Sequence, residues 1–106
     1  MEHRRQYFTG AGNLAEIVAP GAACELEEVR LHLPAVGGSN TFSVSVASGR
    51  APEHNIVLHT KDMSAATDDH YQPTRPVPLL PEDSIGLSWT NAGGLTWGLE
   101  VIWKPA

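Results

Sequence analysis

The chain has very little cysteine: of its 106 residues only Cys24 is one, so no intrachain disulfide can form. Small secreted domains that cannot build a sufficient core are commonly held together by several disulfides. This chain must instead be stabilised by burial of apolar side chains, and a chain of this length buries about two-thirds of its unfolded surface. The sequence predicts one domain over residues 1–106, with residues 1–12 as an edge strand or an N-terminal arm.

Basic residues and long apolar runs are also scarce. Seven Lys and Arg against twelve Asp and Glu give a net charge of −5, whereas binding of nucleic acid draws mainly on clustered basic residues. No segment reaches the ~20 apolar residues of a membrane-spanning helix. The charged start, residues 1–5, is not followed by an apolar run of signal-peptide length. We therefore expect synthesis in the cytoplasm, and neither nucleic acid nor a membrane as a partner.

Catalytic motifs are missing as well. No serine lies in a G-x-S-x-G turn, and Cys24 lies in a predicted strand rather than beside a helix N-terminus or an obvious base. A cupin-like metal enzyme would need two histidines one residue apart on a strand, but His54 and His59 are five residues apart and His32 points outward. We expect no enzyme activity, no catalytic residue and no cofactor.

One acidic cluster contains side chains of the kinds that bind metal ions. Asp68, Asp69 and His70 could hold calcium or zinc in a loop. A plain solvated loop is favoured, because a closed cage of oxygen ligands needs more groups than these three. The sequence therefore predicts no metal site.

The clearest positive signal is the alternation of apolar and polar residues between Pro81 and Lys104. Two alternating runs flank the turn-forming segment Asn91–Gly94, whose glycines tolerate positive φ. This pattern predicts a β-hairpin that buries one face of each strand. The residues expected on that face are Ile85, Leu87, Trp89, Leu95, Trp97, Leu99, Val101 and Trp103.

A second strand is predicted over residues 23–33, where the apolar residues change from even to odd positions. Cys24 and Leu26 share one parity of residues 23–33, whereas Val29, Leu31 and Leu33 share the other. A β-bulge near Glu27–Glu28 would keep all five apolar residues inward, because one extra residue restores the alternation. Glu28, Arg30 and His32 would then face solvent.

Further strands are predicted over residues 41–46, 55–60 and 14–19, the last with a short helix as the alternative. In the strand over residues 55–60 we expect Ile56 and Leu58 to face inward. Residues 61–69 form an excursion or one helical turn capped by Asp62 or Ser64. Four prolines in residues 73–81 require an extended, edge-like strap. Together these features predict an all-β protein, an antiparallel sandwich or jelly roll of about six to eight short strands, with a barrel as the alternative.

The segment Leu80–Asn91 (LPEDSIGLSWTN), with Gly98–Val101, Val29–Pro34 and Phe42–Val46, resembles the small jelly-roll sandwich proteins of tailed-phage virions over residues 23–104. The resemblance implies a structural role without catalytic residues. It suggests a minor capsid or decoration protein of the virion that stabilises a capsid lattice, often as a homotrimer.

Two attachment devices fit such a role: the N-terminal segment and the proline-rich strap, either of which could pair with the sheet edge of a neighbour. The residues expected to make this contact are Arg4, Arg5, Tyr7, Phe8, Pro73, Arg75, Pro76 and Pro78. The alternative is a carbohydrate-binding sandwich that holds sugar rings on tryptophan platforms. The shared inward parity of the three tryptophans favours a place in the core instead.

Overall fold

A computed structural model describes residues 3–38 and 40–106, which form nine strands and one short 3₁₀ helix. The strands are β1 (Arg4–Gly10), β2 (Leu14–Val18), β3 (Cys24–His32), β4 (Thr41–Ala47), β5 (Ile56–Asp62), β6 (Asp68–Tyr71), β7 (Val77–Leu79), β8 (Ser84–Trp89) and β9 (Trp97–Pro105). The 3₁₀ helix spans Pro52–His54. None of the helices in the described residues is long and apolar enough to cross a membrane.

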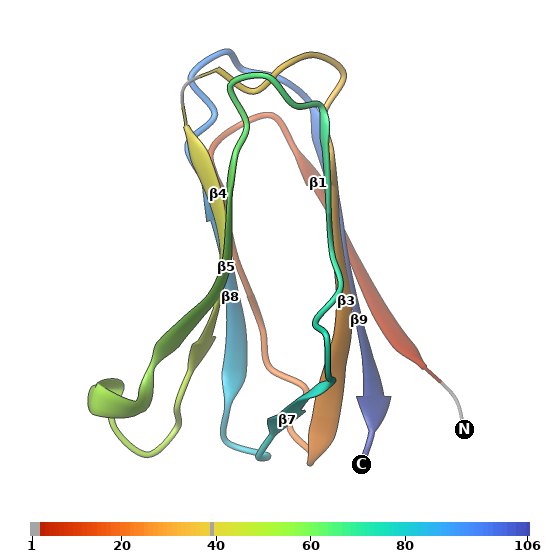
Figure 1. The fold of residues 1–106 in the computed structure, drawn as a ribbon, viewed down its shortest axis with the longest axis vertical. Coiled ribbons are helices and arrows are strands. Elements are labelled where there is room, and N and C mark those ends of the chain that lie inside the picture. Colours follow the sequence, from red (N-terminus) through yellow and green to blue (C-terminus); the bar gives the residue numbers. More distant parts are fainter. Residues whose placement is uncertain (1–2, 39) are drawn as a thin grey trace.

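The strands make two antiparallel sheets that pack as a sandwich (Figure 1). The five-stranded sheet has the order β1-β9-β3-β6, with β7 pairing with β3 along the same side as β6. The four-stranded sheet has the order β2-β8-β4-β5. The predicted antiparallel sandwich is confirmed, with more strands than the six to eight expected, because residues 4–10 and the short segments 68–71 and 77–79 also pair.

The predicted bulge in β3 is present. The register of β3 against β9 shifts between Leu26 and Glu28. As a result Leu26 and Val29 are both fully buried, although their parities differ. The outward direction of Glu28, Arg30 and His32 follows from the same shift, and it places three polar side chains on the outer face of the five-stranded sheet.

The predicted hairpin between β8 and β9 is wrong. Its inward parity is correct, since Leu87, Trp89 and Trp97 are buried, but β8 belongs to the four-stranded sheet and β9 to the five-stranded one. The two strands therefore lie on opposite sides of the core. Residues 90–96 connect the sheets and are longer than the common hairpin loops of about two to five residues. Alternation shows which side chains are inward, but in a sandwich both sheets face the same core.

The side chain of Asn91 organises this crossing. Its amide nitrogen donates hydrogen bonds to the carbonyl oxygens of Ala11, Gly12 and Leu95, and its amide oxygen accepts one from the Leu95 N–H. The Trp97 indole N–H also donates to the Gly12 carbonyl, at 2.8 Å. Buried polar groups need such partners, and here they fasten the 90–96 connection to the 11–13 turn.

Two local predictions in the four-stranded sheet need correction. Ile56 was expected to face inward but is 57% exposed, because it begins the edge strand β5, whose register against β4 is irregular between Val44 and Ser45. Of the two alternatives for residues 61–69, the helical turn is wrong: residues 63–67 are a non-helical connection at the end of the sheet, between β5 and β6. Asp62 ends β5 and its carboxylate accepts a hydrogen bond from the Ser64 N–H. Met63 is fully buried against the core in this otherwise polar stretch.

Both proposed attachment segments are parts of the five-stranded sheet. Residues Arg4–Gly10 form its edge strand β1, paired with β9 along seven residues, so the N-terminal segment is an edge strand and not a free arm. The proline-rich strap is extended as expected and ends in the short strand β7 beside β3.

We predict that Asn91→Ala lowers the free energy of unfolding by about 3 kcal/mol, because several partly buried backbone groups lose their partner together. Urea denaturation followed by tryptophan fluorescence measures the change. The matched control is Asn55→Ala, since the Asn55 amide oxygen accepts a single exposed hydrogen bond from the Ser48 N–H. The control should cost less than about 1 kcal/mol. Equal losses in both variants would refute a central role for Asn91.

Candidate functional site

The outer face of the five-stranded sheet gathers most of the polar side chains that could recognise a ligand. The strand register sets them in rows across the sheet. One row, which we call the Tyr7 row, runs Tyr7, Glu100, Arg30, His70 over β1, β9, β3 and β6. The adjacent Gly98 row runs Thr9, Gly98, His32, Asp68 over the same strands.

Gly98 leaves a gap in the middle of its row. A Cβ placed on Gly98 would meet no atom within 4 Å, so the space above it is open. Thr9 and His32 stand on either side, and the next outward residue along β9 is Glu100. The gap forms the floor of a hollow of about 680 Å³, which we call the outer hollow. Its volume is typical of pockets that bind small molecules, about 300–1,000 Å³.

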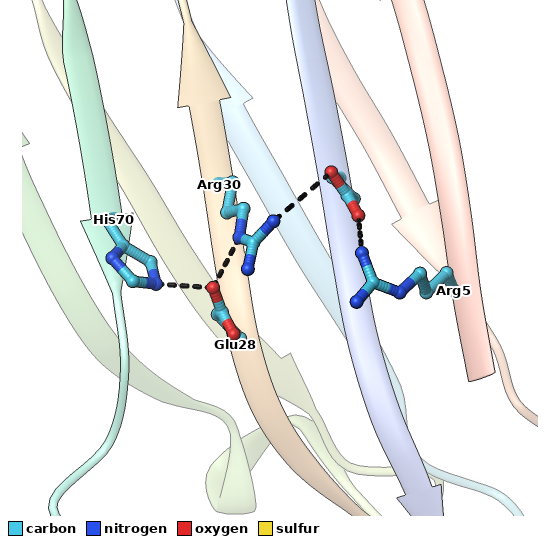
Figure 2. A network of polar contacts seen from close by, with 5 residues as sticks. Arg5, Glu28, Arg30 and His70 are labelled. Carbon is cyan, nitrogen blue, oxygen red and sulfur yellow. Dashed lines mark hydrogen bonds and ion pairs between the residues drawn. The ribbon is translucent and has the colours of Figure 1, made fainter. Parts of the chain in front are cut away.

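The side chains around the outer hollow are joined by ion pairs across four strands (Figure 2). Glu100 binds Arg5 from β1, and its second oxygen lies 3.9 Å from the guanidinium of Arg30. Glu28 accepts hydrogen bonds from Arg30 and from His70. The chain of contacts thus runs continuously from β1 to β6, and it fixes the directions of five long polar side chains on an exposed surface.

Hydrogen bonds at this face lower the pKa values of two carboxyl groups, Glu28 and Asp68. Burial acts to raise the pKa of Glu28, but hydrogen bonds from Arg30 and His70 outweigh it, so the pKa lies below its ordinary value of 4.5. A hydrogen bond from His32 lowers the pKa of Asp68. Both groups therefore stay ionised across the neutral and mildly acidic range.

Asp68, Asp69 and His70 do not form the expected loop but the strand β6, so their side chains alternate. Asp68 and His70 point to the outer hollow, whereas Asp69 points inward and is bonded to His59 across the open edge of the sandwich, at 2.8 Å. His59 also stacks on Tyr71, with 4.5 Å between ring centroids. Within residues 3–38 and 40–106 no group of three or more such side chains could hold a metal ion.

The outer face of the four-stranded sheet is very different. Its central positions carry small or uncharged residues: Ala15, Ile17, Ser43, Ser45, Gly86 and Ser88. The hydroxyl groups of Ser43 and Ser88 lie 2.8 Å apart and bond to each other. The charged side chains that contact one another across strands are thus concentrated on the outer face of the five-stranded sheet.

The residues expected to make contact with a partner do not lie together. Tyr7 and Phe8 line the outer hollow, Phe8 also packs partly against the core, and Arg5 lies beside the hollow through its bond to Glu100. Arg4 points to the other side of β1, where it lines a smaller hollow with Trp103. The remaining expected residues, Pro73, Arg75, Pro76 and Pro78, lie in and before β7, on the opposite side of β3 from β1.

Sequence reasoning missed the residues that complete the outer hollow, namely Arg30, His32, Asp68, His70, Gly98 and Glu100. A signal for part of the set was present, because Arg30 and His32 share the outward parity of their strand, as do Gly98 and Glu100. What the sequence does not contain is the adjacency of β3 and β9, which brings the two sets side by side.

The positions of the tryptophans decide whether one of them forms an exposed platform for a sugar ring. Trp89 and Trp97 are only 2% and 4% exposed and belong to the core, as their parity predicted. Trp103 is half-buried and lines the second hollow, of about 260 Å³, near Pro20, Cys24 and Pro105. No described tryptophan lines the outer hollow, where the exposed aromatic side chain is Tyr7, at 69%.

No protein-family model matches the sequence, and no curated protein matches it. Among solved structures, the fold is similar to that of chitosan-binding module 1 from a chitosanase/glucanase of Paenibacillus sp. IK-5, with a TM-score of 0.55 and 13% identity over 93% of this chain and 74% of that one. A second match, the catalytic domain of Agl-KA, has a TM-score of 0.43 and 19% identity over 94% of this chain and 21% of that one. The first match supports the sandwich fold, and the second carries no argument.

These comparisons contradict the prediction of a capsid or decoration protein of a phage virion. The solved structure with the supporting likeness is a chitosan-binding module and not a virion protein. The virion interpretation was wrong because alternating strands with acidic turns are shared by many sandwich proteins, and a fold does not fix a function. The predicted self-association and capsid partner are not tested by these findings.

We predict that the stability difference between the wild type and Glu28→Gln depends on pH. Because the folded-state pKa of Glu28 is lowered, its contribution is fully present above the ordinary value of 4.5 and is lost as the pH falls through the folded value. The difference in melting temperature should thus be largest near pH 6 and shrink towards pH 3. Glu53→Gln removes the same charge from the exposed 3₁₀ helix and is the control for net charge. A difference that grows on acidification would refute this assignment.

Proposed function

We propose that this chain is a non-catalytic carbohydrate-binding domain that holds a saccharide in the outer hollow. The observation that carries the proposal is the combination of an exposed aromatic ring, an open glycine floor and a pre-formed network of donors and acceptors in one hollow of about 680 Å³. Sugars present apolar C–H faces and a rim of hydroxyl groups, and these three features match both kinds of surface.

Tyr7 supplies the apolar part of the site. Its ring is largely exposed at the edge strand β1, directly across from Glu100. An exposed Tyr offers a flat apolar body with a polar hydroxyl tip, and it loses little conformational entropy on contact. The ring lies beside the charged network, so a sugar that stacks on it reaches Glu100 and Arg30 with its hydroxyl groups.

The ion pairs supply the polar part. Exposed ion pairs contribute only about 0–1 kcal/mol to stability, so folding alone gives little reason for a network of five residues on this face. As a recognition surface it is advantageous, because hydrogen-bonding groups that are already held in place lose less entropy on binding. Their bonds to hydroxyl groups are also stronger than those of neutral groups, since one partner is charged.

Two carboxyl groups at this site, Glu28 and Asp68, are poorly suited to act as the general acid of glycoside hydrolysis. A general acid needs a carboxyl group whose pKa is raised towards the working pH. At the outer hollow the pKa values of Glu28 and Asp68 are lowered instead. Carboxylates that stay ionised can accept hydrogen bonds from hydroxyl groups but cannot protonate a leaving group, which supports binding without catalysis.

The similarity of the fold to a chitosan-binding module is a further support. It extends over nearly the whole chain, and the sandwich is a scaffold on which carbohydrate binding has been built in that protein. This alternative to the virion interpretation no longer requires tryptophan platforms, because Tyr7 and the charged rows take their place.

We predict that Gly98→Val abolishes binding without harming the fold. The added side chain projects into open space on a strand, where valine is well tolerated, but it fills the floor of the outer hollow. Affinity electrophoresis in gels containing soluble polysaccharides, one polymer per gel, should show retardation of the wild type by at least one polymer. Retardation should fall at least about tenfold in Gly98→Val, with an unchanged melting temperature.

The matched control is Ala15→Val, which adds bulk to the outer face of the other sheet and should bind like the wild type. A second pair, Tyr7→Ala and Ile17→Ala, removes one apolar side chain from each outer face at nearly equal exposure, 69% and 70%. Loss of binding in Ala15→Val or Ile17→Ala, with retention in Gly98→Val, would move the site to the four-stranded sheet. A wild type that no polymer retards would refute the proposed function.

A further inference from the structure

The charges at the outer hollow indicate which class of saccharide it takes. The charged side chains at and beside the outer hollow are Arg5, Arg30, Glu28, Glu100 and Asp68, and each carboxylate is already bonded to an arginine or a histidine. With neutral histidines these five groups carry a net charge of only −1, and the side chain of Asp69, which also lines the hollow, is turned to His59. The site is nearly balanced and its charges are mutually satisfied.

A charged ligand gains little at such a surface. An ammonium group that approaches one of these carboxylates also meets the arginine or histidine bonded to it, and an acidic group that approaches an arginine also meets its carboxylate, so repulsion offsets most of the attraction. To gain a full ion pair the ligand would have to displace the existing partner from Glu28 or Glu100, whose side chains are only 15% and 19% exposed. An anion also meets the net charge of −5 on the whole chain.

Hydroxyl groups can bind without breaking these pairs. A guanidinium has five N–H donors, and Arg30 directs its Nε to Glu28 and one Nη to Glu100, so donors remain. A carboxylate has about four acceptor positions, and Glu100 uses each of its oxygens for one arginine contact. The Arg30 Nη and the Glu100 oxygen lie 3.9 Å apart, beyond hydrogen-bond distance, so unfilled donor and acceptor positions stand side by side there. Two neighbouring hydroxyl groups of one sugar can accept from the arginine and donate to the carboxylate.

We infer that the outer hollow selects uncharged saccharides with neighbouring hydroxyl groups over both cationic amino-sugar chains and acidic polysaccharides. The inference rests on the function proposed above and names its ligand class. A sugar ring lies over Gly98 and against Tyr7, with its hydroxyl pair on Arg30 and Glu100. Binding then depends on hydrogen bonds rather than on net charge, and it differs in this respect from a module that binds the cationic polymer chitosan.

The test compares three kinds of soluble polymer in affinity electrophoresis: uncharged ones (hydroxyethyl cellulose, arabinoxylan and a mixed-linkage glucan), cationic chitosan oligomers and anionic polygalacturonate. Each is measured at 20 mM and 500 mM NaCl, since salt screens charge attraction but leaves contacts to uncharged hydroxyls largely intact. We expect at least one uncharged polymer to bind at least about tenfold more tightly than either charged one, with less than a twofold change between the two salt concentrations.

The variant Glu100→Gln tests the balance of charge directly. It keeps the shape of the side chain but leaves Arg5 and Arg30 without the carboxylate they share. We expect weaker binding of the uncharged polymer, by about tenfold, together with a gain in affinity for polygalacturonate. Ser88→Ala, on the outer face of the other sheet, should change neither.

The outcomes separate this inference from the proposed function. Tightest binding to chitosan or polygalacturonate that disappears at 500 mM NaCl, and is lost in Gly98→Val, would overturn the ligand class and leave the proposed function standing. Unchanged affinities in Glu100→Gln would also overturn the inference. Failure of every polymer to bind would overturn both.

Discussion

The pairing of β3 with β9 at the centre of the five-stranded sheet is the contact on which the other features depend. Its register includes a bulge between Leu26 and Glu28, so apolar side chains before and after the bulge enter the same core. The opposite parity then sends Glu28 and Arg30 outward, beside the outward Glu100 of β9. One backbone irregularity thus serves the core and the charged face together, because side chains alternate strictly on either side of it.

The two outer faces of the sandwich carry different kinds of side chain. The four-stranded sheet presents serine, alanine and glycine, and it needs only to cover its side of the core. The five-stranded sheet carries ion pairs across β1, β9, β3 and β6 (Figure 2), and Gly98 leaves an open hollow beside them. Because exposed ion pairs add little to stability, this asymmetry is better explained by recognition than by folding. The partly buried bond between His59 and Asp69 joins the two sheets at their open edge, and that pair belongs to the framework.

The proposed mode of binding follows from how the charges are distributed. A surface with unpaired charges of one sign attracts ions of the opposite sign from a distance and responds strongly to salt. A surface whose charges are paired attracts weakly but offers many oriented donors and acceptors at short range. The outer hollow is of the second kind, which suits the dense hydroxyl groups of an uncharged sugar. Tyr7, at the rim, adds the apolar contact that hydrogen bonds alone do not provide.

The sequence by itself determined the fold class, the inward parity of most strands, the bulge in β3 and the burial of Trp89 and Trp97, because these depend on local alternation and on which side chains avoid water. The sequence did not predict which strands pair with one another. β8 and β9 read as a hairpin but lie in different sheets, since both sheets of a sandwich bury the same parity. Met63 escaped notice because one buried residue in a polar turn has no periodic signature. The outer hollow was decided only by tertiary structure: Tyr7, Arg30, Asp68 and Glu100 come from four strands far apart in the chain, and long-range pairing alone brings them onto one face.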